Sequence, residues 1–304
     1  MKRVTIIGGG KLGTSLGAAL HRAGHEVSAV TCLRKASARK SARLIGRAAP
    51  FTDNARAAEL GDIVFMCLPD RTIAAAANEL ARAAIRFSGK TVFHTSGAFP
   101  ASALAPLRRR GAFVASFHPV QSFVRKDGGA DLFAGIAVAL EGDPKAVAEG
   151  RRIVKSLGGR PLLLSAGQKA AFHAACSIVS NYLVVLFDMA AAALRGAGIK
   201  NRDALGALVP LAKGTLLNVK NIDAARVLTG PIARGDAETV ARHLRTLGRL
   251  PRYKNAYRTL GQIALGLAAR RGLPPERIRA LRLLLGGGQP PPRVRRRTGS
   301  GPSP

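Results

Sequence analysis

The sequence predicts an α/β fold in which a doubly wound, mainly parallel sheet is followed by an all-α second domain. Three observations support this prediction. Up to about residue 165, short β-rich runs alternate with helical stretches, a pattern typical of parallel sheets with helices on both faces. After residue 166 only Ala- and Leu-rich helical patterns follow. A turn of three consecutive glycines separates the first strand from the first helix.

Hydrophobic runs and their breaks place the individual elements. Strands are expected at 3–7, 26–32, 62–68, 90–94, 113–117, 136–141 and 161–164. Helices of the second half are expected at 168–194, 202–219, 237–247, 253–271 and 275–285. Three glycines at 286–288 then open a segment rich in Pro and Arg. Because this segment offers almost nothing to bury, we expect residues 289–304 to form a disordered basic tail.

Composition tests whether the chain binds nucleic acid. The 304 residues carry a formal net charge of +31, which raises a polyanion as a partner. This charge is spread evenly, however, with +14 over residues 1–165, +13 over 166–288 and +4 over 289–304. Aromatic residues make up 5% of the chain and Trp is absent, which argues against platforms for base stacking. We therefore expect no specific nucleic-acid partner.

The sequence also bears on location. The longest apolar run, 178–193, is interrupted by Ser180, Asn181 and Asp188 and falls short of the roughly 18 residues that a spanning helix needs. The first ten residues run directly into a strand and a turn, which leaves no room for a signal peptide. The three cysteines stand far apart with no CxxC pair, so neither a disulfide framework nor a zinc site is expected. These features favour a cytoplasmic protein without a membrane partner.

The glycine turn matches the G-x-G-x-x-G pattern of Rossmann-type dinucleotide-binding domains. A buried strand precedes it, a helix is expected over 14–23, and the next strand follows within about 30 residues. One glycine makes the tight turn, one lets the backbone approach a pyrophosphate, and one lets the helix pack closely on the strand. We assign the cofactor contacts of this turn to Gly8, Gly10, Lys11, Leu12 and Gly13, and residues 1–165 to a dinucleotide-binding domain.

The end of the second strand distinguishes NADP from NAD. An NAD site places an acid there for the ribose hydroxyls, but no acid occurs between Glu26 and Asp53. Thr31, Arg34 and Lys35 stand in that place, and a hydroxyl with two cations suits a 2′-phosphate. Arginines at this position in so basic a chain also arise without a ligand. The pattern favours NADP over NAD.

Several segments together resemble known oxidoreductases. The glycine turn, the run 62–70 and the helical second half resemble the superfamily of pyrroline-5-carboxylate reductase, ketopantoate reductase, prephenate dehydrogenase and the β-hydroxyacid dehydrogenases. More narrowly, 94–97, 116–123, 173–183 and 228–236 are similar to a family of Rossmann-like, NADP-dependent oxidoreductases whose helical half is a domain of unknown function. The resemblance covers residues 1–285 and implies a fold and a cofactor, but no substrate.

The resemblance gives roles to residues at the ends of three strands. Leu68 and Pro69 border the nicotinamide half of the cofactor in the superfamily, although this segment also reads as a simple turn before a helix. Ser96, before Gly97, suits a donor to the substrate or the carboxamide, or an ordinary turn residue. His118, followed by proline as in prephenate dehydrogenases, is expected either to orient or protonate substrate or to bond the backbone.

The helix expected from residue 168 carries a polar stripe. Lys169, His173 and Ser177 follow at spacings of four and share one helix face, and Asn181 continues the stripe further round. Related β-hydroxyacid dehydrogenases use a Lys and an Asn four residues apart at a corresponding helix, whereas His173 takes that second place here. Histidine suits proton transfer because it titrates near neutral pH. The alternative is a solvated face that holds Lys169 and His173.

These residues combine into a functional hypothesis. The chain is expected to be an NADP-dependent oxidoreductase that transfers a hydride between the nicotinamide and a small keto, imino or hydroxy acid. His173 would exchange the proton, Asn181, Ser96 and His118 would position the substrate, and Lys169, Ser177 and Arg234 would bind it. No cluster of His, Asp or Glu indicates a metal.

The second half and the alternative function complete the prediction. Residues 166–288 are expected to form a helical domain for substrate binding and dimerisation, because members of the superfamily commonly pair through their helical halves. The structural alternative for Asp236 is the N-cap of the helix that follows it. A non-catalytic NADP-binding sensor or scaffold is the alternative function.

Overall fold

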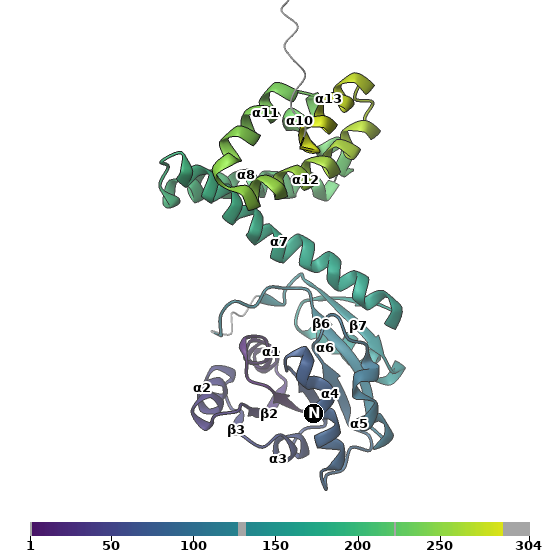
Figure 1. Cartoon of the computed structure of the whole chain (residues 1–304). Helices are drawn as coiled ribbons and strands as arrows, with labels where there is room; N and C mark the ends of the chain where they lie inside the picture. Colours follow the sequence, from purple (N-terminus) through teal and green to yellow (C-terminus); the bar gives the residue numbers. More distant parts are fainter. Residues whose placement is uncertain (1, 127–131, 222, 288–304) are drawn as a thin grey trace, which may run out of the picture. The chain divides into compact units, whose positions relative to one another are not determined.

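A computed structural model describes residues 2–126, 132–221 and 223–287. The chain divides into two compact units, Met1–Tyr182 and Leu183–Pro304, which are described separately (Figure 1). The predicted tail, 289–304, lies outside the described residues.

An eight-stranded sheet forms the centre of the first unit, with the order β3-β2-β1-β4-β5-β6-β7-β8. All neighbouring strands run parallel except β6 and β7, which are antiparallel. The strands are β1 (Arg3–Ile7), β2 (Glu26–Thr31), β3 (Ala49–Phe51), β4 (Ile63–Met66), β5 (Thr91–His94), β6 (Phe113–Pro119), β7 (Ala137–Gly142) and β8 (Arg160–Leu163). This topology confirms the predicted doubly wound, mainly parallel sheet.

Helices cover the two faces of the sheet because alternate strand residues point to opposite sides. Val4 and Ile6 of β1 belong to one core cluster and Ile7 to the other. The first cluster takes in α1 (Lys11–Arg22), α2 (Lys35–Ile45) and α6 (Pro144–Ser156). The second takes in α3 (Asn54–Glu59), α4 (Asp70–Arg82), the 3-10 helix η1 (Ala101–Leu104) and α5 (Ala105–Arg109). The stacked rings of Phe65 and Phe93, with centroids 4.9 Å apart, belong to the first cluster.

The sequence did not indicate β3, which is three residues long, lies at the edge of the sheet and contains Pro50. Proline has no N–H to donate, and at the edge of a sheet this donor is not needed. A short strand can therefore form here without the hydrophobic run that would have predicted it. The chain order reverses at β1, which lies between β2 and β4. In open α/β sheets ligands bind at such a switch point, beyond the carboxyl ends of the strands.

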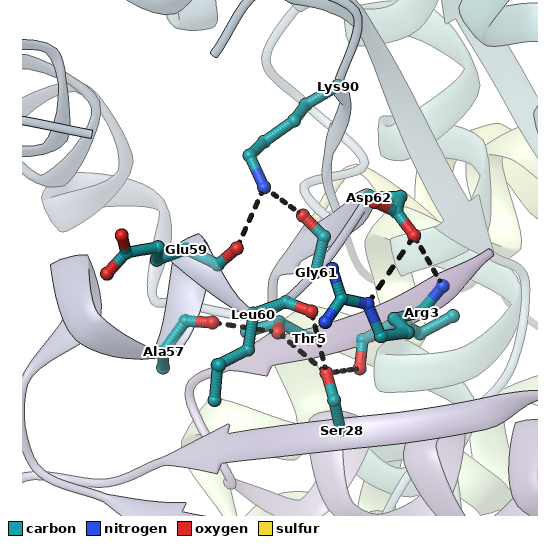
Figure 2. A network of polar contacts seen from close by, with 10 residues as sticks. Arg3, Thr5, Ser28, Ala57, Glu59, Leu60, Gly61, Asp62 and Lys90 are labelled. Atoms are coloured by element: carbon teal, nitrogen blue, oxygen red, sulfur yellow. Dashed lines mark hydrogen bonds and ion pairs between the residues drawn. The ribbon is translucent and has the colours of Figure 1, made fainter. Parts of the chain in front are cut away.

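The opposite edge, where strands begin, is held by a polar network (Figure 2). The Nζ of Lys90, just before β5, donates to the carbonyl oxygens of Gly61 and Glu59, the latter at 3.1 Å, and so caps the last turn of α3. The carboxylate of Asp62 accepts the backbone N–H of Arg3 at 2.9 Å and lies 3.8 Å from its guanidinium. These contacts tie the starts of β1, β4 and β5 together, away from the switch point.

Helix α7 (Lys169–Gly196) runs through the division between the units, and the short 3-10 helix η3 (Ala166–Gln168) precedes it. The capping box of Ser165 and Gln168 at this entry explains why helix begins at the residue where the strand pattern ends. Its residues up to Tyr182 belong to the unit of the sheet. The assignment of 166–288 to a substrate and dimerisation domain stays a prediction.

One helix in the described residues, Ala166–Gly196, is long and apolar enough to cross a membrane by length and composition. Its most apolar window has a mean hydropathy of 1.7 and is 6% buried. The sequence prediction that no segment meets this criterion was therefore wrong, because a few polar residues do not offset so many Ala, Val and Leu. Lys169, the first residue of its α-helical part, is nevertheless buried and belongs to the first unit.

The second unit consists of helices. After the end of α7 come α8 (Asn201–Asn221), α9 (Ala224–Val227), α10 (Gly230–Arg234), α11 (Ala237–Thr246), η4 (Leu247–Arg249), α12 (Pro251–Arg270) and α13 (Pro275–Leu285). Its core joins Val240 and Leu244 of α11 to Leu265 of α12 and Leu281 of α13. Tyr253 of α12 donates to the carboxylate of Asp188 in α7 at 2.6 Å. The predicted all-α second half is confirmed.

Candidate functional site

The glycine turn joins β1 to α1 at the switch point. Gly8 has φ +97°, and a Cβ there would overlap the carbonyl oxygen of Cys67. A Cβ on Gly13 would overlap the carbonyl oxygen of Gly8. By contrast, a Cβ on Gly10 would meet nothing within 4 Å. Two of the glycines are therefore required by packing, while the third keeps open the space in front of the helix.

That space faces unpaired backbone donors. Helix α1 begins at Lys11, three residues before the predicted start, so Lys11, Leu12 and Gly13 form its first turn. The N–H groups of a first turn have no partner within the helix. The N-cap, Gly10, offers no side chain to them, and no acidic residue stands in the first turn. This helix end presents free donors and a positive dipole end, which suit a pyrophosphate.

Thr31 supports the turn from the second strand. Its hydroxyl accepts the N–H of Gly8 at 3.1 Å and donates to Oδ1 of Asn54 at 2.8 Å. Because both functions of the hydroxyl are used and the residue is buried, Thr31 shapes the turn and does not present a free hydroxyl to a phosphate. Arg34, the N-cap of α2, and Lys35, its first residue, are both exposed at the same edge.

Lys169 lies at the heart of a second polar group, at the carboxyl ends of β5 and β6. Its side chain is 1% exposed. Nζ donates to Oγ of Ser116 at 2.6 Å and to the carbonyl oxygen of Ser96 at 3.3 Å. The hydroxyl of Ser116 also lies 3.3 Å from that carbonyl oxygen, to which it donates. This geometry rules out the solvated face for Lys169.

His94 ends β5 and is bonded through both ring nitrogens. Nδ1 accepts the N–H of Ser96 at 3.2 Å, and Nε2 lies 3.1 Å from the carbonyl oxygen of Pro100. The first contact requires an unprotonated Nδ1, so the proton sits on Nε2 and the ring is neutral. Burial lowers the pKa of His94 to about 4. The hydroxyl of Ser96 accepts the N–H groups of Ala98 and Phe99, so it holds the turn as the turn interpretation expects.

Two further imidazoles meet at Gly97. A Cβ on this residue would overlap Nδ1 of His173 and come within 2.8 Å of Nε2 of His118. The two rings cross edge to face with centroids 5.7 Å apart. The two histidines are 55 positions apart in the sequence. The fold brings them together because the end of β6 and the beginning of α7 both lie against Gly97.

His118 and His173 open onto a hollow of about 310 Å³ within the first unit. The hollow is lined by His118, Val120, Gln121, Ser122, His173, Cys176, Ser177, Val179, Ser180 and Asn181. None of these residues is Asp, Glu, Lys or Arg. The predicted stripe of His173, Ser177 and Asn181 thus borders one hollow, whereas Lys169 lies behind the turn.

The rings of His118 and His173 both carry an unpaired nitrogen at this hollow. Burial first, and then the charge of Lys169, lower the pKa of His118 to about 4, so that ring is neutral at pH 7. The Nδ1 atoms of both His118 and His173 are buried without a hydrogen-bond partner in the structure. Buried polar atoms are normally satisfied, so unpaired ones at a hollow are typical of a ligand site. Burial also raises the pKa of the Cys176 thiol, which disfavours a thiolate nucleophile.

The remaining predicted residues lie elsewhere. Leu68 follows β4 and packs beside Gly8, and Pro69 is the N-cap of α4. Arg234, exposed at the end of α10, belongs to the second unit, so the structure does not place it with the imidazoles. Asp236 accepts the N–H of Thr239 at 3.0 Å, as the N-cap interpretation expects. The described residues hold no group of three His, Cys, Asp or Glu side chains that would bind a metal.

Ser116 and Gly97 are the contributors that sequence reasoning missed. Ser116 is fully buried in a strand whose neighbours Ala115 and Phe117 are apolar. A hydroxyl at a fully buried strand position needs a partner, and this was the available signal. Gly97 stood in the motif, but nothing in the sequence showed that two imidazoles would pack against it.

The neutral state of His94 makes stability depend on pH. Its pKa is about 4 in the fold and about 6.5 when unfolded, so between these values the unfolded chain binds a proton that the fold does not. Stability should be complete above pH 6.5 and fall as the pH drops toward 4, by at most roughly 3 kcal/mol from this residue. Urea unfolding between pH 7 and 4.5 measures the fall. His94→Asn should make the fall smaller and leave the part that His118 contributes, and parallel profiles for the two proteins would contradict the assignment.

Comparison with known proteins agrees with this architecture. Residues 1–119 match the family model of a Rossmann-like domain, and residues 136–264 match a domain of unknown function, DUF2520. No curated protein matches the sequence.

Several solved structures share the fold over most of their length. The putative NADP oxidoreductase BF3122 from Bacteroides fragilis has a TM-score of 0.74 at 24% identity, over 87% of this chain and 98% of its own. An imine reductase from Pseudomonas sp. has a TM-score of 0.65 at 19% identity, over 88% and 97%. A reductive aminase from Aspergillus terreus, solved with NADPH, has a TM-score of 0.59 at 21% identity, over 94% and 93%. At these identities the likeness shows the fold alone.

The two matched segments together span both halves of the chain and confirm the resemblance seen in the sequence. The chain thus joins an N-terminal segment that matches a Rossmann-like domain to a C-terminal segment that matches DUF2520.

Proposed function

We propose that this protein is an NADP-dependent oxidoreductase that acts on a carbonyl or imine carbon of a small molecule. The observation that carries the proposal is the pairing of two features in the first unit. One is the glycine turn, with open space before a helix that lacks an acid in its first turn. The other is a hollow with two imidazoles that carry unpaired nitrogens. Both lie at the carboxyl edge of the sheet, where ligands of this fold class bind.

The residues present fit a dinucleotide. Gly8, Gly10, Lys11, Leu12 and Gly13 would hold the pyrophosphate through backbone N–H groups, and the same turn would be blocked by any side chain at Gly8 or Gly13. When bound, a nicotinamide cofactor supplies or accepts a hydride. Leu68 and Pro69 would border its nicotinamide half. No acid for the ribose hydroxyls lies between Glu26 and Asp53, which supports NADP.

The chain's own residues would handle the proton and the substrate. Reduction of a C=O or C=N bond needs one proton on the oxygen or nitrogen, and His173 would give it and recover it in the reverse direction. His118, neutral at pH 7, would donate or accept one hydrogen bond to the substrate. Asn181 and Ser177 line the same hollow and would complete the substrate contacts. Ser96 would contribute by shaping the turn.

A small keto, imino or hydroxy acid is the proposed substrate class. Such a substrate needs a cation for its carboxylate, and the assignment of Arg234 to this role stays a prediction from the sequence. The imine reductase from Pseudomonas sp. that shares the fold acts on imines according to its name, which supports the imino members of this class.

Pairing of two chains through the helical half is also proposed. Val184 of α7 and Leu211 and Leu217 of α8 are 69%, 68% and 67% exposed within the structure. Burying such side chains against a second copy would remove apolar surface from water. Light scattering of the purified chain should give twice the monomer mass. A cytoplasmic location and the absence of membrane and specific nucleic-acid partners stay predictions.

Cofactor preference gives the direct test of the proposed NADP site. Arg34→Ala with Lys35→Ala removes two exposed cations at the start of α2. Each charged hydrogen bond to a phosphate contributes about 1.5–3 kcal/mol, so each lost contact should lower NADPH affinity by about 10- to 100-fold, while NADH affinity stays unchanged. Calorimetry with both cofactors measures this. Arg82→Ala with Arg86→Ala removes a matched pair of exposed arginines and should change neither affinity. Equal losses for NADPH and NADH would exclude the 2′-phosphate site.

A further inference from the structure

The ammonium group of Lys169 is buried without an acidic partner. Among the residues that the structure describes, no carboxylate lies within ion-pair distance of it, and its two hydrogen bonds go to a neutral hydroxyl and a neutral carbonyl. Burying a cation is costly unless it is well hydrogen-bonded. Burial lowers the pKa of Lys169, while the more distant carboxylates of Glu141 and Asp70 act in the opposite direction. Such a costly arrangement calls for an explanation beyond packing.

The contacts of Lys169 tie together three parts of the fold. Its own helix, α7, carries His173 one turn later. Ser116 belongs to β6, which carries His118 two residues further on. The carbonyl of Ser96 belongs to the turn after β5, where the N–H of Ser96 in turn bonds His94. Lys169 thereby fixes the segments that carry all three imidazoles of the site.

The charge of Lys169 also faces these imidazoles. Around His118 the charged and titratable groups are Lys169 and His173 on α7, His94 on β5 and Asp70 at the start of α4. Burial is the largest cause that lowers the pKa of His118, the charge of Lys169 is the second, and Asp70 opposes them. Lys169 acts in the same direction on His94. A cation behind the turn thus disfavours a second cation on the rings in front of it.

We infer that Lys169 is a positioning residue: its buried ammonium locks the 94–97 turn to β6 and α7 and adds to the burial that disfavours a charged imidazole at His118. This assignment replaces the sequence prediction that Lys169 binds substrate, because its Nζ is already bonded on the inner side of the turn. The inference rests on the proposed function, in which an uncharged His118 contacts the substrate. The effect of Lys169 on His118 can be measured in the protein without any ligand.

The test is a titration of the histidine rings by NMR in the full-length protein without cofactor. In the unmodified protein His118 should titrate far below 6.5, near pH 4. Lys169→Met and Lys169→Gln both remove the charge, and Gln keeps a hydrogen-bond donor in case Met prevents folding. In either variant the midpoint of His118 should rise by on the order of one pH unit, the effect of one charge several ångströms away. Lys169→Arg keeps the charge and should leave the midpoint low.

A matched control removes a charge elsewhere in the same unit. Lys155→Met, on the exposed face of α6, should leave the titration of His118 unchanged. A normal midpoint for His118 in the unmodified protein overturns the inference, and so does an unchanged midpoint in both neutral variants. A rise in Lys169→Arg as large as in Lys169→Gln would show that packing and not charge is responsible, which also overturns it. Because no cofactor or turnover enters, these outcomes are independent of whether the protein is an oxidoreductase.

Discussion

Gly13→Ala should destabilise the protein by more than about 3 kcal/mol and abolish dinucleotide binding. A methyl group at this position would overlap the carbonyl oxygen of Gly8 and press on the side chains of Cys67 and Ile6. Backbone cannot yield as a flexible side chain does, so the strain falls at the large end of the range for overpacked sites. Urea unfolding and calorimetric titration with NADPH measure the two effects.

Gly10→Ala is the matched control for this strain. Its methyl group would meet nothing within 4 Å, so the stability without ligand should stay within about 0.5 kcal/mol of the unmodified protein. The methyl would nevertheless project into the space that the backbone shares with the pyrophosphate, so NADPH affinity should fall. Unchanged affinity in Gly10→Ala, with an intact fold, would mean that this space holds no pyrophosphate.

His173→Ala should lower kcat/KM by about 10²- to 10⁴-fold, the usual contribution of a general acid or base. The substitution leaves the glycine turn untouched, so the affinity for NADPH should not change. Steady-state kinetics with the best substrate and calorimetry with NADPH measure the two quantities. His25→Ala is the control, since His25 bonds Ser156 outside the hollow and should leave both quantities unchanged.

The outcome of this experiment also separates the alternatives. A full loss in His118→Ala with little change in His173→Ala would transfer the proton role to His118. If the unmodified protein binds NADPH tightly but turns over none of the keto and imino acids tried, the result favours the non-catalytic sensor or scaffold function.

The fold was largely predictable because its signals are local. Buried runs between helices predicted seven strands correctly, and the glycine spacing predicted the turn between β1 and α1 correctly. The strand β3 was not predicted because three edge residues that include a proline show no periodic hydrophobic pattern. The start of α1 was predicted three residues too late, because glycines in the first turn of a helix look like part of the preceding turn in the sequence.

The site was less predictable because its contacts join distant parts of the chain. The spacing of Lys169, His173 and Ser177 showed a shared helix face but not what covers it. Whether Lys169 faced solvent or the interior depended on the packing of α7 against β6, and its bond to Ser116 spans 53 positions in the sequence. The meeting of His118 and His173 at Gly97 has the same origin.

The most direct test of the central claim is the oxidation of NADPH and NADH in the presence of a panel of small keto and imino acids, followed optically alongside calorimetric binding of both cofactors. We predict tight binding of NADPH in preference to NADH and turnover of at least one member of the panel, with kcat/KM greatly reduced in His173→Ala. The absence of tight NADPH binding would contradict the account.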